Sequence, residues 1–438
     1  MGGIISSSAP AVPNLRYLRA FREIVRCGSV SAAARAIHLT QPAVTQIVAH
    51  LELSFATHLF ERTSAGMLPT EAARLLLARV DRALAQLTDG LSEATRARDR
   101  DGGPARADVL RAITVAQLVS LVAVVEAGSF GGAARWTGLA RPSLHRAARS
   151  LENVIGIPLF EATSFGVRPT REAERLARRV QLAFAEIAQA RAEIAALGGG
   201  SIGRTVIGAM PLARSLLVPR AVLEFSNTHP QHTISILDGP YENLLAALRK
   251  GFADMLIGAL REPLPGPDIV QEHLFDDPLA VVVRAHHPLA RRPPPSIGEL
   301  SSFRWVAPRP GTPLSQQFTE LFTTAGIEVP PQQIECNSLA AARALLIGSD
   351  RVMLLSEHQI QQELASGLLV ALPHPGGCVA RRIGLTMRRD WRATPVQAVL
   401  LDILRQTARH LARELATVRH PSAGTLGVKS ASVEQRTG

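Results

Sequence analysis

Apolar residues near the start of the chain recur at helical spacing and outline two short helices joined by a turn. An alanine-rich helix is predicted after Ser29, which can cap it, and His38-Leu39 forms the turn. The next helix begins at Gln41-Pro42 after the cap Thr40, because proline in a first turn costs no amide hydrogen bond. Its apolar stripe comprises Val44, Ile47, Val48 and Leu51. This pattern predicts a helix-turn-helix, a unit whose second helix enters the major groove of DNA.

The same pattern returns one hundred positions further along the chain. The matches include glycine, proline and phenylalanine and need no gap, so the composition of the chain does not explain them. Matching pairs are Gly28-Ser29 with Gly128-Ser129, Pro42 with Pro142, Leu51-Glu52 with Leu151-Glu152, and Leu59-Phe60-Glu61 with Leu159-Phe160-Glu161. The chain is therefore predicted to carry two helix-turn-helix modules in tandem.

Each copy leads into a long helix with an apolar stripe. Thr70 and Thr170 are suitable caps for these helices. The stripes step by four and three residues, as in the seam of a helix pair: Leu76, Val80, Ala83 and Leu87 in the first copy, and Leu176, Val180, Ala183, Ile187, Ala190 and Ile194 in the second. We expect these helices to pair within one molecule. Residues 98–112 contain glycine, proline and many charges and are predicted to be a linker.

After residue 204 the pattern changes to short apolar runs that alternate with helical stretches. This alternation is typical of βαβ units. Predicted strands lie near 206–210, 233–237, 254–260, 279–283, 304–307, 334–336, 352–355 and 382–387, and predicted helices near 212–227, 242–249, 314–325, 339–347 and 396–411. Two α/β halves joined by crossing strands are expected to enclose a cleft for a small molecule. The polar stretch 420–438 is predicted to be a disordered tail.

Composition narrows the class of protein. The 438 residues suffice for two or three domains, and no apolar run approaches the roughly 18 residues of a membrane span. A net charge of +11 favours an anionic partner such as nucleic acid. The three cysteines, Cys27, Cys336 and Cys378, are widely spaced and the start of the chain does not resemble a signal peptide. We therefore expect a cytoplasmic protein without a membrane partner.

The sequence offers no constellation that predicts catalysis. Ser215 and Ser356 lack a nucleophile-elbow motif, and no dinucleotide or phosphate-loop fingerprint is present. His286-His287 has no acidic or cysteine partner at metal-ligand spacing. The prediction is a protein that is not an enzyme and uses neither cofactor nor metal.

Several of these stretches resemble one known family. GSVSAAARAIHLTQPAVTQIVAHLE and LFERTSAGMLPTEA look like the N-terminal module of LysR-type transcriptional regulators. The later stretches VIGAMPLARSLLVPRAVLEF, FADMLIGAL, HHPLARR, RPGTPLSQQF and RRIGLTMRRD are similar to the galactose-binding protein regulator branch of that family. The resemblance covers nearly the whole chain. The chain differs from the family in having a second DNA module.

The resemblance implies a fold and a function. The fold is multidomain, α followed by α/β: two winged helix-turn-helix modules with linker helices, then a two-lobed effector domain like type 2 periplasmic binding proteins. The implied function is bacterial transcription regulation by a homo-oligomer on double-stranded DNA, modulated by a small organic effector. The expected boundaries are 14–70 and 113–170 for the modules, 71–97 and 171–197 for the linker helices, and 204–415 for the effector domain. The alternative is a transport solute-binding protein that does not bind DNA.

Candidate DNA-binding residues lie at the start of each second helix and in the wing. They are Thr40, Gln41, Pro42, Ala43, Thr45, Gln46 and the wing residue Arg62 in the first copy, and Arg141, Ser143, His145 and Arg146 in the second. Glutamine reads adenine and arginine reads guanine, so the two copies should prefer different bases. The wing position of the second copy holds Ala162. An alternative is that the second copy serves only in dimerisation.

Candidate effector-binding residues follow the predicted strands of the two-lobed domain. By fold logic and resemblance, they are Met210, Leu212, Arg214, Pro308, Thr312, Asn337, Ser338, Leu355 and Ser356. The expected effector is sugar-like or an organic acid. Thr312 and Ser338 have an alternative role as helix caps, and Arg214 can instead pair with a carboxylate.

Overall fold

The computed structural model describes residues 12–63, 66–96, 106–164, 166–199, 203–331 and 334–419. It divides into two units, the first comprising residues 1–272 with 384–401 and the second residues 273–383 with 402–438. The tail predicted for 420–438 lies outside the described residues.

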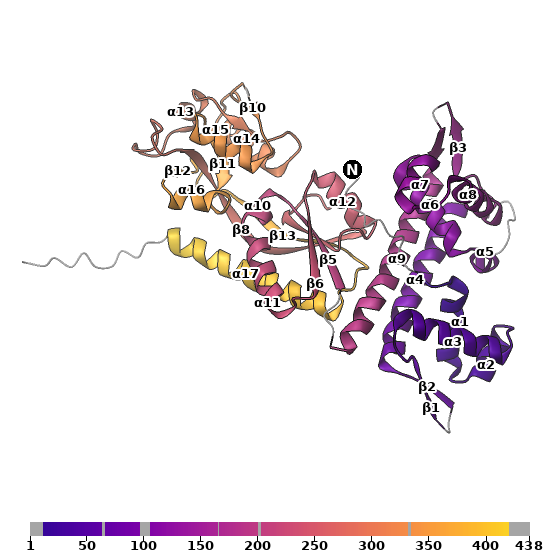
Figure 1. Ribbon diagram of the computed structural model, residues 1–438. Helices are drawn as coiled ribbons and strands as arrows, with labels where there is room; N and C mark the ends of the chain where they lie inside the picture. Colours follow the sequence, from indigo (N-terminus) through magenta and orange to yellow (C-terminus); the bar gives the residue numbers. More distant parts are fainter. Residues whose placement is uncertain are drawn as a thin grey trace, which may run out of the picture. The chain divides into compact units, whose positions relative to one another are not determined.

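The first module has the predicted helix-turn-helix and wing (Figure 1). It comprises α1 (Leu15–Cys27), α2 (Val30–Ala36), α3 (Gln41–Phe55), β1 (Phe60–Thr63) and β2 (Gly66–Pro69). Ser29 caps α2 by accepting a hydrogen bond from the amide of Ala32, 3.1 Å away. The four residues of the predicted α3 stripe are buried. The antiparallel pairing of β1 with β2 forms the wing.

The second module repeats this order one hundred positions later. It comprises α6 (Val115–Ala127), α7 (Phe130–Thr137), α8 (Arg141–Ile155), β3 (Phe160–Thr163) and β4 (Gly166–Pro169). Part of the predicted linker is helical, since α5 spans Arg106–Ala112. Val109 of α5 is buried in the common core, and this burial stabilises a helix that the charged sequence around it does not predict.

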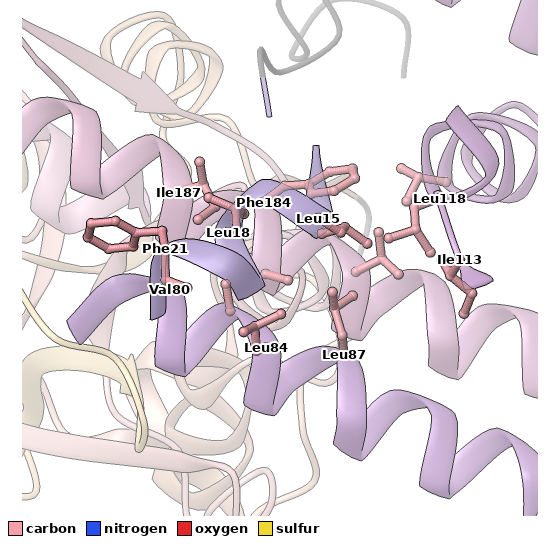
Figure 2. Packing of buried hydrophobic residues seen from close by; sticks show 14 of the residues in the cluster. Leu15, Leu18, Phe21, Val80, Leu84, Leu87, Ile113, Leu118, Phe184 and Ile187 are labelled. Atoms are coloured by element: carbon pink, nitrogen blue, oxygen red, sulfur yellow. The ribbon is translucent and has the colours of Figure 1, made fainter. Parts of the chain in front are cut away.

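The long helices α4 (Glu71–Thr95) and α9 (Arg171–Leu197) pack against each other. Their contacts run antiparallel, because Arg79 meets Glu193 whereas Glu93 meets Arg179. Both predicted stripes are buried, and they belong to one core that includes residues of both modules. Figure 2 shows part of this core, with Val80, Leu84 and Leu87 of α4 near Phe184 and Ile187 of α9. The core thus joins the two copies into a single apolar unit.

Two arginines at matching positions cross this interface. Arg79 donates from Nε and Nη2 to the carboxylate of Glu193, at 3.0 and 2.5 Å, and Arg179 makes the equivalent contacts with Glu93 at 3.2 and 2.5 Å. The first pair is buried more deeply, with side-chain exposures of 5% and 8% against 25% and 27%. The pairing is therefore pseudo-symmetric, as in an isologous dimer interface, within one chain.

Arg79 also reaches a second carboxylate. Its Nη1 donates to Glu186 at 2.8 Å and to Gln189 at 2.6 Å. Burial alone would lower the pKa of Arg79, but its bonds to Glu193 and Glu186 outweigh burial and raise that pKa. At position 86, the counterpart of Glu186, Gln86 accepts a bond from Arg179 at 2.8 Å. Arg79 thus bonds two buried carboxylates, whereas Arg179 bonds one carboxylate, which is only half-buried.

The first lobe of the α/β domain lies in the first unit. Its strand β5 (Gly203–Ala209) pairs in parallel with β6 (His232–Leu237) and β7 (Met255–Ala259). Helices α10 (Pro211–Ser215), α11 (Leu217–Thr228) and α12 (Tyr241–Arg249) connect the strands. The single helix predicted over 212–227 is instead two helices, because the backbone of Leu216 leaves helical geometry with φ −146°.

The second lobe forms the second unit. Strand β8 (Ile269–Arg284) pairs antiparallel with β11 (Met353–Ser356) and β12 (Leu369–Pro373), and β9 (Val306–Ala307) is parallel to β10 (Ile334–Glu335). The helices are α13 (Ile297–Ser301), α14 (Pro313–Thr323), α15 (Leu339–Ile347), the 3-10 turn η2 (Glu357–Ile360) and α16 (Gln361–Ala365). A core of Trp305, Phe318 and Phe322 anchors α14.

Three elements have residues in both units: β8, β13 (Ala380–Arg388) and α17 (Pro395–Arg419). Strand β8 begins at Ile269, well before the predicted 279. The prediction missed its first half because that half is polar and half-exposed and lacks the pattern of a buried strand. Strand β12 was not predicted. In the described residues no single helix is long and apolar enough to span a membrane, although α6 and α7, bent by 114°, reach that length and composition together.

The buried arginine makes a prediction about stability. Replacing Arg79 by Met leaves Glu193 without its buried partner and Glu186 with only the half-buried Arg82, and should cost about 3–5 kcal/mol of unfolding free energy. Hydrogen exchange of α4 and α9 measures this loss. The matched variant Arg179→Met, at the more exposed copy of the site, should cost less. Equal losses for the two variants would contradict the assigned role of burial.

Candidate DNA-binding heads and effector lobes

The first helix-turn-helix module, here called the first reading head, has polar side chains at the start of α3. Thr40, Gln41, Pro42, Thr45 and Gln46 are exposed, and Ala43 is half-buried. The predicted cap differs, because Thr40 occupies the N-cap position but its side chain makes no capping bond. The side-chain Nε2 of Gln41 donates to the hydroxyl of Ser31 on α2 at 2.9 Å. This contact orients Gln41, and Ser31 is a residue that the sequence analysis did not single out.

The second reading head presents a more basic surface at the start of α8. Arg141, Ser143, His145 and Arg146 are all exposed. Arg146 donates to the hydroxyl of Ser143 at 3.2 Å, and the ring of His145 lies 5.0 Å from that of Phe130. The counterpart of Ser31 is Gly131, so Arg141 has no equivalent hydroxyl beside it. The two heads therefore present different hydrogen-bonding groups on the same scaffold.

The wings also differ. Arg62 lies in β1, opposite Met67 in the register, and its side chain lies outside the described residues. In the second wing Ala162, opposite Val167, is exposed and uncharged. Contact of Arg62 with DNA remains a prediction.

The predicted effector residues lie in two lobes that belong to different units. In the first lobe, Met210 precedes α10 and its amide donates to the carbonyl of Ile257 at 2.9 Å. Arg214 forms an ion pair with Asp238, as the alternative role foresaw. The side chain of Leu212 lies inside the lobe, with 6% of its surface exposed, so it offers little to a ligand.

In the second lobe, two helix starts follow adjacent parallel strands. Thr312 caps α14 by accepting from the amide of Ser315 at 3.1 Å, and Ser338 caps α15 by accepting from Ala341 at 3.4 Å. Both helices follow the carboxyl ends of β9 and β10, so their amides lie at the same edge of the parallel pair. Asn337 is exposed beside this edge. The cap role is thus realised, and it is compatible with a ligand at the same helix starts.

Three further predicted residues of this lobe are covered. Pro308 and Leu355 are buried, and Ser356 has no exposed surface. The hydroxyl of Ser356 donates to Asp277 at 2.6 Å, so it is already used inside the lobe. The structure therefore does not support Leu355 or Ser356 as residues whose side chains meet an effector.

Asp277 is the centre of a buried polar cluster that the sequence did not reveal. It accepts bonds from Ser356, from Arg381 at 2.8 Å and from the ring of His358 at 3.2 Å. Burial alone would raise the pKa of Asp277, but the bond from His358 and the charge of Arg381 outweigh burial and hold that pKa below its ordinary value. The cluster joins β8, β11 and β13. Because Ser356 donates to the aspartate and the ring of His358 also bonds the aspartate, the serine hydroxyl and the imidazole do not form a nucleophile–base pair.

Comparisons with known proteins agree with this geometry. The profile of the bacterial regulatory helix-turn-helix protein, lysR family, matches twice, at residues 15–74 and 115–174, and that of the LysR substrate binding domain matches residues 198–409. The HTH-type transcriptional regulator GalR of Pseudomonas putida is 34% identical over 395 residues, which cover 90% of this chain and 97% of that protein.

The chain belongs to the LysR family of transcriptional regulators.

A second relative agrees with the family, and a solved structure shares the fold. The HTH-type transcriptional regulator PcaQ of Agrobacterium fabrum is 26% identical over 294 residues, covering 67% of this chain and 94% of that protein. A full-length OxyR variant from Pseudomonas aeruginosa has a TM-score of 0.50 at 21% identity, covering 68% of this chain and 95% of that one, and this likeness shows the fold.

The family establishes what this LysR-type chain does. It is a DNA-binding transcription regulator with an effector-binding domain, and its relatives are regulators and not enzymes. The two helix-turn-helix matches count against the alternative of a solute-binding protein that does not bind DNA. Both modules are visible in the profile matches, so the duplication predicted from the sequence is confirmed.

The repeat of this LysR-type regulator also contains the signal for the ion pairs between α4 and α9. Arg79 and Glu93 recur as Arg179 and Glu193 at the same offset of one hundred. A charge pair kept in register beside two apolar stripes predicts ion pairs across a helix interface. The Asp277 cluster had no such signal, because its members are scattered along the chain.

The reading heads predict different losses of recognition. Gln41→Ala should weaken binding at one half of the DNA site and Arg141→Ala at the other, each by about 1–3 kcal/mol, because each removes one base contact. Binding of duplexes with one half-site scrambled at a time measures these losses. The same loss on random DNA, for either variant, would contradict a role in base recognition.

The Asp277 cluster predicts a pH dependence. A carboxyl whose folded pKa is lowered adds stability that is present above its unfolded pKa, near 3.9, and is lost as the pH falls through the folded value. Asp277→Asn should therefore destabilise the second lobe at pH 7, and the deficit should shrink below about pH 4. Hydrogen exchange in β8 and β11 measures it. Asp402→Asn, at an exposed helix position, should show no such trend.

Proposed function

We propose that a single chain of this regulator carries both halves of a DNA-binding dimer and reads two unlike half-sites. A small hydroxylated or acidic molecule bound by the effector domain modulates this reading. The observation that carries the proposal is the antiparallel pairing of α4 with α9 by pseudo-symmetric arginine–glutamate contacts.

The linker supports pairing within the chain. Helix α4 ends at Thr95 and α5 begins at Arg106, so few residues connect the copies. A connection this short gives the second helix a high effective concentration near the first, and the cost of closing the loop grows only slowly with its length. Pairing within one chain is thus favoured over pairing between chains at low protein concentration.

The difference between the heads supports unlike half-sites. A dimer of identical heads related by a two-fold axis matches a palindrome. Here Gln41 with Ser31 occupies the positions that Arg141 and Gly131 hold in the second copy. Glutamine bonds adenine and arginine bonds guanine in the major groove, so the operator should contain two different sequences.

The long relative fits this proposal. The alignment with the Pseudomonas putida regulator spans 395 of the 438 residues, so it includes the second module entirely and extends into the first. LysR-type regulators are typically oligomers, and we propose that whole chains of this protein associate further in the bacterial cytoplasm through their effector domains.

The effector proposal is supported by the chemistry of the second lobe. The helix starts after Thr312 and Ser338 direct amide hydrogens to one edge, and the exposed Asn337 adds an amide group. Such groups bind carboxylates and hydroxyls. In the first lobe Arg214 forms an ion pair with Asp238, so only some of the N–H groups of Arg214 remain to donate to a ligand.

The stoichiometry of the DNA complex tests the two-headed chain. One full-length chain should protect both half-sites of one duplex, as measured by native mass spectrometry and footprinting at nanomolar protein. The variant Arg141→Ala should keep protection of the half-site read by Gln41 and lose the other. Two chains bound per symmetric palindrome, with no effect of Arg141→Ala, would show the second module to be a scaffold.

A ligand screen tests the effector class. Sugars and organic acids at millimolar concentration are expected to include a compound that stabilises the protein by about 2.7 kcal/mol when present at one hundred times its Kd. Asn337→Ala should lower the affinity of the protein for this compound without changing the melting temperature of the free protein. Thr319→Ala, an exposed position on α14, is the control and should bind normally.

A further inference from the structure

A short segment of the effector region contacts the linker helix of the first module. The Nη2 of Arg82 donates to the carbonyl of Asp390, and the Nη2 of Arg79 donates to the carbonyl of Arg392 at 3.1 Å. The side-chain nitrogen of Gln86 donates to the carboxylate of Asp390 at 2.7 Å. Arg79, Arg82 and Gln86 lie on one face of α4 and together bind residues 390–392. Both segments belong to the first unit.

The same three side chains also hold α9. Arg79 contacts Glu186 and Glu193, and Arg82 contacts Glu186 at 2.6 Å. Gln86 accepts a bond from Arg179. Each of these α4 residues therefore shares its hydrogen-bonding groups between the other linker helix and the effector region. A displacement of residues 390–392 leaves donors of Arg79, Arg82 and Gln86 without partners at the helix pair.

This contact is asymmetric between the two copies. The counterpart of Arg82 on α9 is Leu182, which is buried and has no group that donates a hydrogen bond. Helix α9 is joined to the effector lobe through the chain itself, and Lys250 of that lobe pairs with Glu126 of α6 at 2.7 Å. The first module has the polar contact with residues 390–392 in place of a covalent link.

Residues 390–392 directly follow a strand shared by both units. Strand β13 starts at Ala380 in the second unit and ends at Arg388 in the first. The guanidinium of Arg388 donates to the carbonyls of Leu248 and Ala253, at 2.7 and 3.1 Å, which fixes the end of the strand in the first lobe. At the other end, Arg381 belongs to the Asp277 cluster. The strand therefore connects the interior of the second lobe to the linker helices.

We propose that Arg79, Arg82 and Gln86 are positioning residues of a latch, through which the effector lobes set the placement of the first DNA-binding head relative to the second. Arg79 and Arg82 meet the carboxylates of Glu186 and Glu193, and a third carboxylate, that of Asp390, accepts from Gln86. Arg79 has 5% of its side chain exposed and Glu186 has 10%, so an unpaired state is costly. A network of this kind has discrete made and broken states, which is what a coupling between two sites requires.

Thermodynamic reciprocity provides a test without knowledge of the effector. If the state of the latch alters DNA binding, then DNA must alter the latch by the same factor. The probe is the duplex in which footprinting locates the two half-sites. Saturation of the full-length protein with this duplex should change hydrogen exchange in residues 385–392 by about fivefold or more, the lower range of allosteric couplings.

The variant Arg82→Met with Asp390→Ala should reduce this DNA-induced change to less than twofold while the duplex still binds. A purely structural role would speed exchange equally with and without DNA and leave their ratio unchanged, which would overturn the proposal. Asp390→Ala alone, at a position with 46% exposure, replaces the double variant if that one does not fold. The control Asp402→Ala, at an exposed position of α17, should keep the full response.

The latch rests on the pairing of α4 and α9 within one chain, which the stoichiometry of the DNA complex examines separately. One chain per duplex together with unchanged exchange at residues 385–392 disproves the latch alone. Two chains per duplex with a full exchange response would instead disprove the two-headed chain and keep the coupling.

Discussion

The packing of α4 against α9 is the constraint on which the rest of the first unit depends. The α4 stripe consists of leucine, valine and alanine, and the α9 stripe adds isoleucine. Each stripe covers the other, which removes both from water. Antiparallel packing places one module at each end of the pair. The arginine–glutamate contacts fix the register, because a slip along the seam leaves Arg79 buried without a carboxylate. Spacing of the heads follows from this single interface.

Duplication within one chain frees the two copies to diverge. An interface between identical subunits must use the same residue twice, whereas here Glu186 faces Arg79 and Gln86 faces Arg179. The carboxylate of Glu186 gives Arg79 a second buried partner. In the other half of the interface, the side-chain amide of Gln86 donates to Asp390. The same freedom applies to the heads, where Gln41 and Arg141 occupy one position of the scaffold with different preferences for bases.

The effector domain depends on the strands that its two lobes share. Strands β8 and β13 and helix α17 have residues in both units, and the Asp277 cluster ties β8, β11 and β13 together by buried hydrogen bonds. Gly384 shows how closely the strands approach, because an added Cβ atom would lie 2.1 Å from the carbonyl oxygen of Glu272. Glycine is needed there for space, at the place where β13 enters the first unit.

Local patterns in the sequence determined the helix-turn-helix modules, their duplication, the apolar stripes and most strands of the α/β domain. Caps, helical spacing and alternating runs act over a few residues, so they can be read without the fold. Only the tertiary structure decided that Arg79 holds both α9 and residues 390–392, that β8 begins at Ile269, and that Ser356 is enclosed with Asp277. Those features join segments far apart in the chain, and burial of a polar group depends on neighbours that no local pattern names.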